Sequence, residues 1–174
     1  FSGVYHVGVG KDYTTLTAAA ADINTRTLTG PVTLILDDAS YPSETFPIQF
    51  EANAGSSSAN TLTIKPDSGI NPLIAGDFTG GIIVFNGIDY VTIDGSNNGS
   101  TSRNLTIYNT KNALSGFWAV GITANASGDV STNITIKNSI IKCIPVHASS
   151  SNVTGIRFYF RFRCNCGFYY RIRN

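Results

Sequence analysis

A short run of alternating β-branched and polar residues occurs three times along this chain, at 61–65, 90–94 and 133–137. Each run is followed by two more short apolar runs, at 72–75 and 81–85, then at 104–108 and 119–123, then at 139–142 and 155–158. Gly, Asn and Ser residues separate the runs, and the repeats differ in length. This pattern predicts an all-β parallel solenoid, in which each repeat forms one coil of three strands.

The N-terminal part of the chain contains the one convincing helix. Alternation over 4–9 and apolar runs at 32–36 and 46–50 predict strands. In the segment 16–24, helical spacing produces one apolar stripe, formed by Leu16, Ala19, Ala20 and Ile23. Thr14 or Thr15 is the expected N-cap. We expect this α-helix to cap the open apolar end of the solenoid.

Three regions follow from these patterns. Residues 1–31 hold the first strand and the capping helix, 32–158 the parallel coils, and 159–174 an aromatic and arginine-rich strand or tail. Polar loops at 95–103 and 124–132 interrupt the coils, as loops do where a solenoid builds a working surface. Asn109 and Asn138 each close a strand run, which predicts an internal ladder of amides; the alternative is that both face solvent in turns.

The C-terminal region has a different composition. Apolar side chains occupy even positions from Ile156 to Cys166, arginines and polar residues the odd ones, and Gly167 precedes another aromatic and basic run. The pattern predicts a long strand, a turn at Gly167 and a shorter returning strand. Such a pair could cap the last coil or associate with another copy through Phe158, Phe160, Phe162, Phe168 and Tyr170. The alternative is that this tail lies outside the natural boundary of the domain.

Two segments carry a family resemblance. Residues 10–19 (GKDYTTLTAA) and 30–34 (GPVTL) resemble the start of right-handed parallel β-helix proteins of the pectate-lyase-like superfamily. Residues 89–96 (DYVTIDGS) and 102–109 (SRNLTIYN) look like the large secreted cell-surface β-helix proteins of Bacteroidetes. The resemblance implies a right-handed parallel β-helix and an extracellular or cell-surface location. It leaves activity open, because the superfamily includes lyases, hydrolases, esterases and non-catalytic adhesins.

Composition and charge argue against binding to nucleic acid and against association with a membrane. Only 13% of the 174 residues are charged and the net charge is +1, which provides no global attraction for nucleic acid or an anionic membrane. Five arginines in the last 18 residues are too few for a nucleic-acid surface. No apolar run approaches the roughly 20 residues of a membrane span. The chain begins at Phe1 and contains no Met, so we expect a processed protein or a fragment.

Candidate chemistry is sparse, and we predict no catalytic residue, metal site or cofactor. Three cysteines form no even-numbered disulfide framework. Lys65, Asp94 and Lys137 end corresponding strands, so we expect an ion-pair ladder with a lowered Asp94 pKa rather than a calcium cage. His6 and His147 lack an interpretable partner and are expected to be surface or packing residues.

Aromatic residues suggest one candidate binding surface. Phe117 and Trp118 are adjacent, so in a strand one of them is expected to face solvent, where an indole can stack on sugars. The alternative is that Trp118 packs under the loop 124–132. A carbohydrate site, if present, would comprise Asp94, Arg103, Tyr108 and Trp118.

The sequence therefore favours a non-enzymatic extracellular β-helix module that acts as a surface stalk, an adhesin or a self-assembling structural protein. We expect homo-oligomers or filaments formed through the coil ends or the C-terminal tail. The alternative is a carbohydrate-active enzyme or carbohydrate-binding module of the same fold, with a glycan as its ligand.

Overall fold

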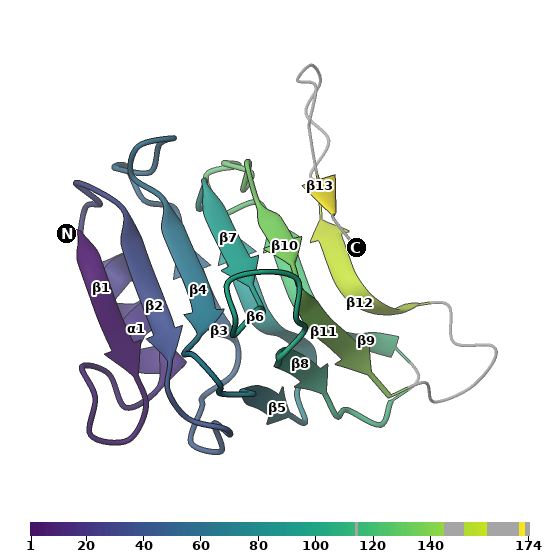
Figure 1. Cartoon of the computed structure of the whole chain (residues 1–174). Coiled ribbons are helices and arrows are strands. Elements are labelled where there is room, and N and C mark those ends of the chain that lie inside the picture. The colour runs from purple at the N-terminus through teal and green to yellow at the C-terminus, as the bar shows by residue number, and fades with distance from the viewer. Residues whose placement is uncertain (114, 145–151, 160–170, 173–174) are drawn as a thin grey trace.

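The computed structural model describes residues 1–113, 115–144, 152–159 and 171–172, and over these the chain is a parallel β-solenoid of about three turns (Figure 1). Helix α1 (Leu16–Asn24) is the one helix of this part. The strands are β1 (Gly3–Val7), β2 (Val32–Leu36), β3 (Ile48–Glu51), β4 (Leu62–Pro66), β5 (Leu73–Gly76), β6 (Gly80–Asn86), β7 (Val91–Asp94), β8 (Leu105–Asn109), β9 (Ser115–Thr123), β10 (Thr135–Lys137), β11 (Ser139–Cys143), β12 (Asn152–Tyr159) and β13 (Arg171–Ile172).

The strands assemble into parallel sheets, each of which collects strands from successive turns. One sheet has the order β1-β2-β4-β7-β10-β13, a second has β5-β8-β11 and a third has β3-β6-β9-β12. We call them sheets A, B and C. Every strand pair within them is parallel. Neighbours in space are therefore separated in sequence by a full turn, as the repeat pattern predicts.

Like residues lie over like residues along the solenoid. Ile93 is in register with Ile64 on one side and with Ile136 on the other, which confirms the alignment predicted from the repeats. Ile64 and Ile93 are completely buried. On sheet C, the rings of Phe50 and Phe85 lie 5.8 Å apart in the same way. The core is thus a set of apolar columns parallel to the solenoid axis.

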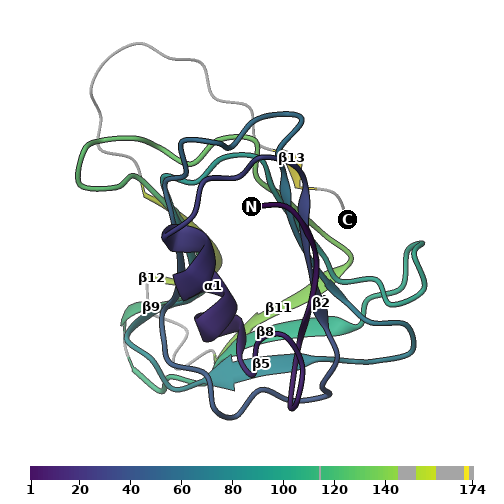
Figure 2. The same ribbon diagram turned by 90° about the vertical axis from the view of Figure 1, so that its left-hand side faces the viewer.

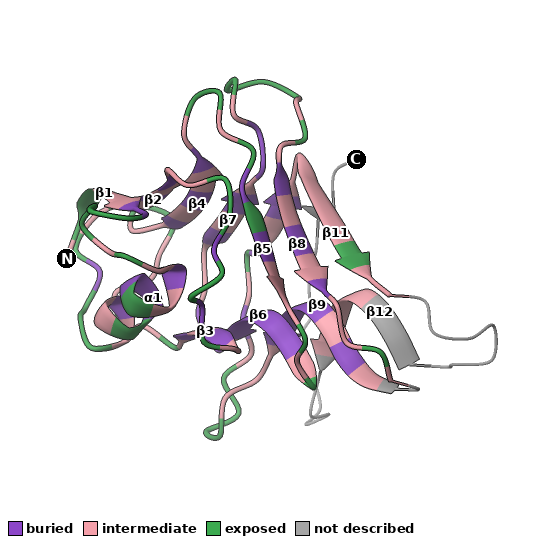
Figure 3. Cartoon of the chain, turned by 90° about the horizontal axis from the view of Figure 1, so that it is seen from below, coloured by how far each residue is buried: buried purple, intermediate pink, exposed green. Residues whose placement is uncertain are grey.

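Alternation along each strand separates core from surface, as Figure 3 shows in the alternating colours of the strands. In β2 and β4, the first, third and fifth residues are buried and the two between them are half-buried. Because side chains of a strand point alternately to opposite faces, one face fills the interior and the other is the outer surface. The outer face of sheet A carries a column of threonines: Thr33, Thr63, Thr92 and Thr135.

Helix α1 begins and packs as the sequence predicts. Of the two candidate N-caps, Thr15 is the one observed, and its Oγ1 accepts a 3.0 Å hydrogen bond from the backbone N–H of Ala18. The predicted stripe of Leu16, Ala19, Ala20 and Ile23 is buried. Figure 2 looks onto the N-terminal end, where α1 lies at the end of the solenoid. The helix packs beside β3, which makes it the terminal element of sheet C.

At the N-terminal end, α1 also satisfies the backbone of the first strand of sheet C. The side chain of Asn24 accepts from the N–H of Glu51 and donates to the carbonyl of Gln49, each at 2.9 Å. These backbone groups of β3 point away from β6. One asparagine thus replaces the neighbouring strand that the edge lacks.

The other two sheets are closed at the same end by loops. On β1, the N–H of His6 donates to Asp12 Oδ2 at 2.7 Å, and its carbonyl accepts from Tyr13 N–H at 3.1 Å. On β5, Leu73 exchanges hydrogen bonds with the backbone of Ala39 and Tyr41. At the first edge of each sheet, some of the outward backbone groups therefore have partners: those of His6 on β1, of Leu73 on β5, and of Gln49 and Glu51 on β3.

The predicted ladder between Asn109 and Asn138 is wrong. Asn109 ends β8 and is in register with Gly76 and Cys143, whereas Asn138 forms the corner between β10 and β11. The side chain of Asn109 is completely buried, and its Nδ2 donates to the carbonyls of Phe78, Gly80 and Trp118. Asn138 has a φ of 53°, a left-handed conformation that asparagine tolerates and that turns the chain in one residue.

The predicted hairpin of the C-terminal region, with its turn at Gly167, falls mostly on residues outside the described part. Strand β12 belongs to sheet C, and β13 pairs in parallel with β10 on sheet A, with Ile172 in register with Ile136. Residues 160–170 lie outside the described part, so the expectations for Phe160, Phe162, Phe168 and Tyr170 are not addressed by it. That residues 159–174 form a region distinct from the coils remains a prediction.

Candidate functional site

The four residues of the predicted carbohydrate site come from different sheets. Asp94 ends β7 on sheet A, Arg103 lies in the loop that follows, Tyr108 belongs to β8 on sheet B, and Trp118 belongs to β9 on sheet C. Asp94 and Arg103 share one corner of the solenoid, whereas Trp118 lies on another sheet. A role of the four in binding a sugar stays a prediction.

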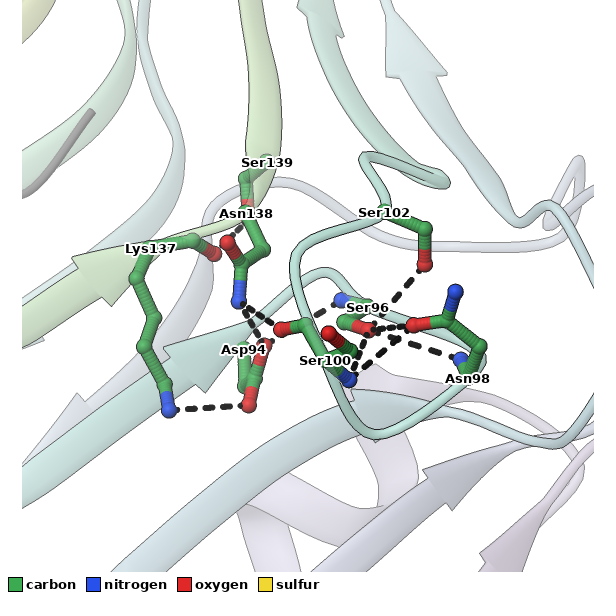
Figure 4. A network of polar contacts seen from close by, with 8 residues as sticks. All are labelled: Asp94, Ser96, Asn98, Ser100, Ser102, Lys137, Asn138 and Ser139. Atoms are coloured by element: carbon green, nitrogen blue, oxygen red, sulfur yellow. Dashed lines mark hydrogen bonds and ion pairs between the residues drawn. The ribbon is translucent and has the colours of Figure 1, made fainter.

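Asp94 is the centre of a polar network at the corner between sheets A and B (Figure 4). Its Oδ2 lies 3.0 Å from Lys137 Nζ, and its Oδ1 accepts a 2.9 Å hydrogen bond from Asn138 Nδ2. The backbone N–H of Ser96 also donates to Oδ1, at 3.2 Å. The carboxylate therefore joins one turn of the solenoid to the next.

The pKa of Asp94 is shifted in the direction that the sequence predicts. Burial by itself raises the pKa of Asp94, but the hydrogen bonds from Asn138, Lys137 and Ser96 outweigh it, and the net pKa is lowered. The ion pair is made with Lys137, the residue in register with Asp94. No ion pair joins Lys65 to Asp94 among the described residues, although the preceding residues Ile64 and Ile93 are in register. Asp94 thus forms an ion pair with the following turn, rather than standing in a full ladder.

The loop after Asp94 is folded by its own hydroxyls and amides. Ser96 is buried, and its Oγ accepts from the N–H of Ser100 at 3.1 Å and donates to Asn98 Oδ1 at 2.8 Å. Asn138 also donates to the carbonyl of Ser100, so the next turn holds this loop in place. The sequence indicated the polar character of the loop, but not that Ser96 would be its internal anchor.

Three asparagines extend this corner onto the surface. Asn71 Oδ1 accepts hydrogen bonds from Asn104 Nδ2 at 2.6 Å and from Asn97 Nδ2 at 3.1 Å. Asn97 Nδ2 also donates to the carbonyl of Ile70. Amides and hydroxyls of this kind can recognise a ligand by hydrogen bonding. The single carboxylate of the corner is already neutralised by Lys137, so the arrangement does not supply the several acidic ligands that calcium prefers.

Trp118 lies against the outer surface of sheet C. The guanidinium carbon of Arg157 is 4.5 Å from the centroid of the indole ring, a cation–π distance. The Nε1 edge of the ring lies over Gly81 and Gly121, where an added Cβ would come within 2.6 and 2.7 Å of Nε1. The indole is thus half-buried, with Arg157 over one face of its ring.

A second polar cluster was not predicted. His6 Nδ1 lies 2.8 Å from Asp37 Oδ2, and Lys11 Nζ lies 3.2 Å from Asp37 Oδ1. The Asp37 side chain is only 8% exposed. An open cavity of about 420 Å³ adjoins the cluster, lined by His6, Gly10, Lys11 and Asp12. The sequence carried a signal for it, since Lys11 and Asp37 each follow a strand, and parallel neighbours bring such ends together.

The cluster of His6, Lys11 and Asp37 connects two turns of the solenoid. The buried carboxylate of Asp37 receives the cationic Lys11, and it orients the imidazole of His6 through Nδ1. His147 lies outside the described residues. Within the part of the chain that the structure describes, no three His, Cys, Asp or Glu residues are grouped as a metal site would require.

Comparison of the chain with protein-family models, with curated proteins and with solved structures finds no match. The fold defines the protein as a parallel β-solenoid. Among the described residues, no helix is long and apolar enough to cross a membrane.

Proposed function

We propose that this chain is a non-enzymatic structural module of the pectate-lyase-like type, displayed outside the cell as a stalk, an adhesin or a self-assembling scaffold. Its resemblance to secreted β-helix proteins of Bacteroidetes supports the extracellular location. The low content of charged residues, 13%, suits a chain built from many strands and tight polar turns.

The proposed fold is a right-handed helix with three strands per coil. In support, strands that follow one another along the chain belong in turn to sheets A, B and C from β4 to β12. Connections between parallel strands of one sheet are right-handed in about 98% of known cases.

One observation carries the structural role, namely the incomplete covering of the last turn. Ile136 on β10 is buried, and Ile172 of β13 lies in register beyond it. In contrast, Ile141 and Ile156 of the same turn pack against the core but are only half-buried. Ile141 is in register with the buried Ile107, so it continues a core column to the last strand of sheet B. Apolar surface of this kind favours contact with a further layer.

Copies of the chain therefore associate through the C-terminal end of the solenoid. A contact made through the end of a solenoid adds layers along the axis, and it gives fibres when it does not close into a ring. The outer surface and its polar loops remain available for display.

Substitution of Ile141 by Lys tests this role, because a charge at the exposed end of a core column would oppose stacking. The matched control is Thr106→Lys on the neighbouring strand β8, which is half-buried on the outer face one turn inside the end. Sedimentation velocity at several protein concentrations should show self-association for the unmodified chain and for Thr106→Lys, and weakened association for Ile141→Lys. Circular dichroism verifies that both variants fold. A chain that stays monomeric at all concentrations contradicts the proposal.

Removal of residues 159–174 tests the tail separately. The predicted association through Phe160, Phe162, Phe168 and Tyr170 requires that the truncated chain associate more weakly. An unchanged assembly state by light scattering rejects this contribution of the tail, while leaving the end of the solenoid as the contact.

A second candidate function, carbohydrate binding, is favoured by the exposed amides at the Asp94 corner. Asn71 is exposed and joins Asn97 and Asn104 in one hydrogen-bonded group. A glycan array probed with the unmodified chain and with Asn71→Ala tests it. Binding that the substitution removes supports this function, and absence of binding by the unmodified chain rejects it.

A further inference from the structure

Charge is distributed unequally along the solenoid axis. Residues 1–60 carry six acidic and two basic side chains, whereas the described residues of the last turn (133–144, 152–159 and 171–172) carry four basic side chains, Lys137, Lys142, Arg157 and Arg171, and no acidic one. The first part thus has a net charge of −4, and the described residues of the last turn have a net charge of +4. Because successive turns stack in sequence order (Figure 1), this difference in sequence is a difference between the two ends of the molecule.

Both ends also present apolar side chains. At the N-terminal end, Val9 in the loop after β1 is 83% exposed. At the other end, Ile141 is only half-buried. The two ends are therefore complementary in charge, and each offers apolar surface to a contact.

We propose that copies of this chain associate head to tail, with the acidic N-terminal end of one copy seated on the basic C-terminal end of the next. This inference rests on the proposed self-assembly and adds its polarity and its driving force. Contact between opposite ends is heterologous, so it can continue from copy to copy. Contact between two like ends would instead bring charges of one sign together.

The closed N-terminal edges determine the character of this contact. The outward backbone groups of His6 are taken by Asp12 and Tyr13, and those of β3 by Asn24. Sheets therefore do not continue from one copy into the next by main-chain hydrogen bonds at these positions. Side chains and charges make the contact, so it is reversible and sensitive to salt, unlike the main-chain pairing of amyloid.

Salt provides the first test. The Debye length falls from about 10 Å at 0.1 M to about 3 Å at 1 M ionic strength, so exposed charges at the two ends cease to attract. Sedimentation equilibrium of the full chain should show an association constant at least about tenfold weaker in 1 M than in 0.05 M NaCl.

Charge variants provide the decisive test. Val9→Lys adds a cation at the exposed N-terminal end without removing a hydrogen-bonding side chain, and Lys142→Glu reverses an exposed charge on β11 at the other end. Each variant alone should associate more weakly than the unmodified chain. Mixing the two should restore association, because the lysine introduced at position 9 of one copy then meets the glutamate introduced at position 142 of another.

Matched controls carry the same charge changes away from the ends. Ser68→Lys lies in an exposed turn after β4, and Lys65→Glu lies on the outer face of β4. Both should associate like the unmodified chain.

The outcomes separate the two proposals. Association that resists 1 M salt and both end variants overturns the head-to-tail contact and leaves self-assembly standing. Association that the end variants weaken but that mixing does not restore also overturns it. A chain that remains monomeric overturns both this inference and the proposed self-assembly.

Discussion

The carboxylate of Glu44 accepts a 2.6 Å hydrogen bond from the backbone N–H of Leu16, the first residue of α1. The same carboxylate accepts from the N–H and the hydroxyl of Thr17, at 2.7 and 2.5 Å. Glu44 is 9% exposed and reaches the helix from the segment before β3. A negative charge at this position complements the unpaired N–H groups of a helix N-terminus.

Replacement of Glu44 by Ala should therefore lower the free energy of unfolding. Buried hydrogen bonds to a charged group contribute about 1.5–3 kcal/mol, and the loss of this group leaves helix N–H groups without an acceptor. Urea unfolding followed by circular dichroism measures the effect. Ser43→Ala, at the exposed neighbouring position, is the control and should be neutral. Equal stability of the two variants would show that the capping helix does not depend on Glu44.

Removal of the core column at one turn should have a larger effect. Ile93→Ala leaves a cavity between Ile64 and Ile136, and cavities of this type cost about 2–5 kcal/mol. Thr92→Ala, one residue away on the outer face, should cost about 1 kcal/mol or less. Urea midpoints of the two variants measure the difference, and similar values would contradict the assignment of the two faces.

Substitution of Asp94 by Asn should destabilise the corner between sheets A and B, by about 1–2 kcal/mol at neutral pH. The variant loses the charge that pairs with Lys137 and receives the Asn138 amide. Asp77→Asn is the control, because its carboxylate pairs with Lys111 but is 61% exposed, and such surface pairs contribute little. Urea unfolding at pH 7 compares the two variants, and an equal loss of stability in both would contradict a special role of the Asp94 corner.

The effect of Asp94 should depend on pH in one direction. Its pKa is lowered in the folded chain, so the ionised carboxylate stabilises the fold above the ordinary aspartate pKa of about 3.9. This contribution is lost as the pH falls through the lower pKa of the folded state. The difference in unfolding free energy between the unmodified chain and Asp94→Asn should therefore shrink as the pH falls below about 4. A difference that stays constant down to about pH 2 would exclude this linkage.

Fluorescence can report the packing of Trp118, the only tryptophan of the chain. Gly121→Ala places a Cβ 2.7 Å from the indole Nε1, closer than real contacts, so the ring must move away from sheet C. We expect emission at longer wavelength, since a displaced indole meets more water. Ser127→Ala, exposed in the loop after β9, should leave the spectrum unchanged. An unchanged spectrum in Gly121→Ala would mean that the ring does not rest on the glycine.

The solenoid could be predicted because its signals are local and repeated. Alternation at 61–65, 90–94 and 133–137 determines which side chains face inward, and stacking then places Ile64, Ile93 and Ile136 in one column. The helix was predictable for a similar reason, as its stripe and the Thr15 cap lie close together in the sequence.

Contacts between residues of different turns were harder to predict from the sequence. Asn109 and Asn138 both follow apolar runs, but the loops differ in length, so the sequence did not reveal that one ends a strand and the other forms a corner. The pairing of His6 with Asp37 depends on β1 lying beside β2, although a helix separates them in sequence. The anchoring of the 95–103 loop by Asn138 likewise comes from the following turn.

Closure of the first edge by Asn24, Asp12 and Tyr13 makes the two ends of the solenoid unequal in how they can evolve. An additional repeat placed before β1 would have to displace these side chains and the helix. One placed after the last turn would meet strands in register and a partly open core. Tandem duplication should therefore lengthen proteins of this architecture behind their final turn, with the first turn inherited intact.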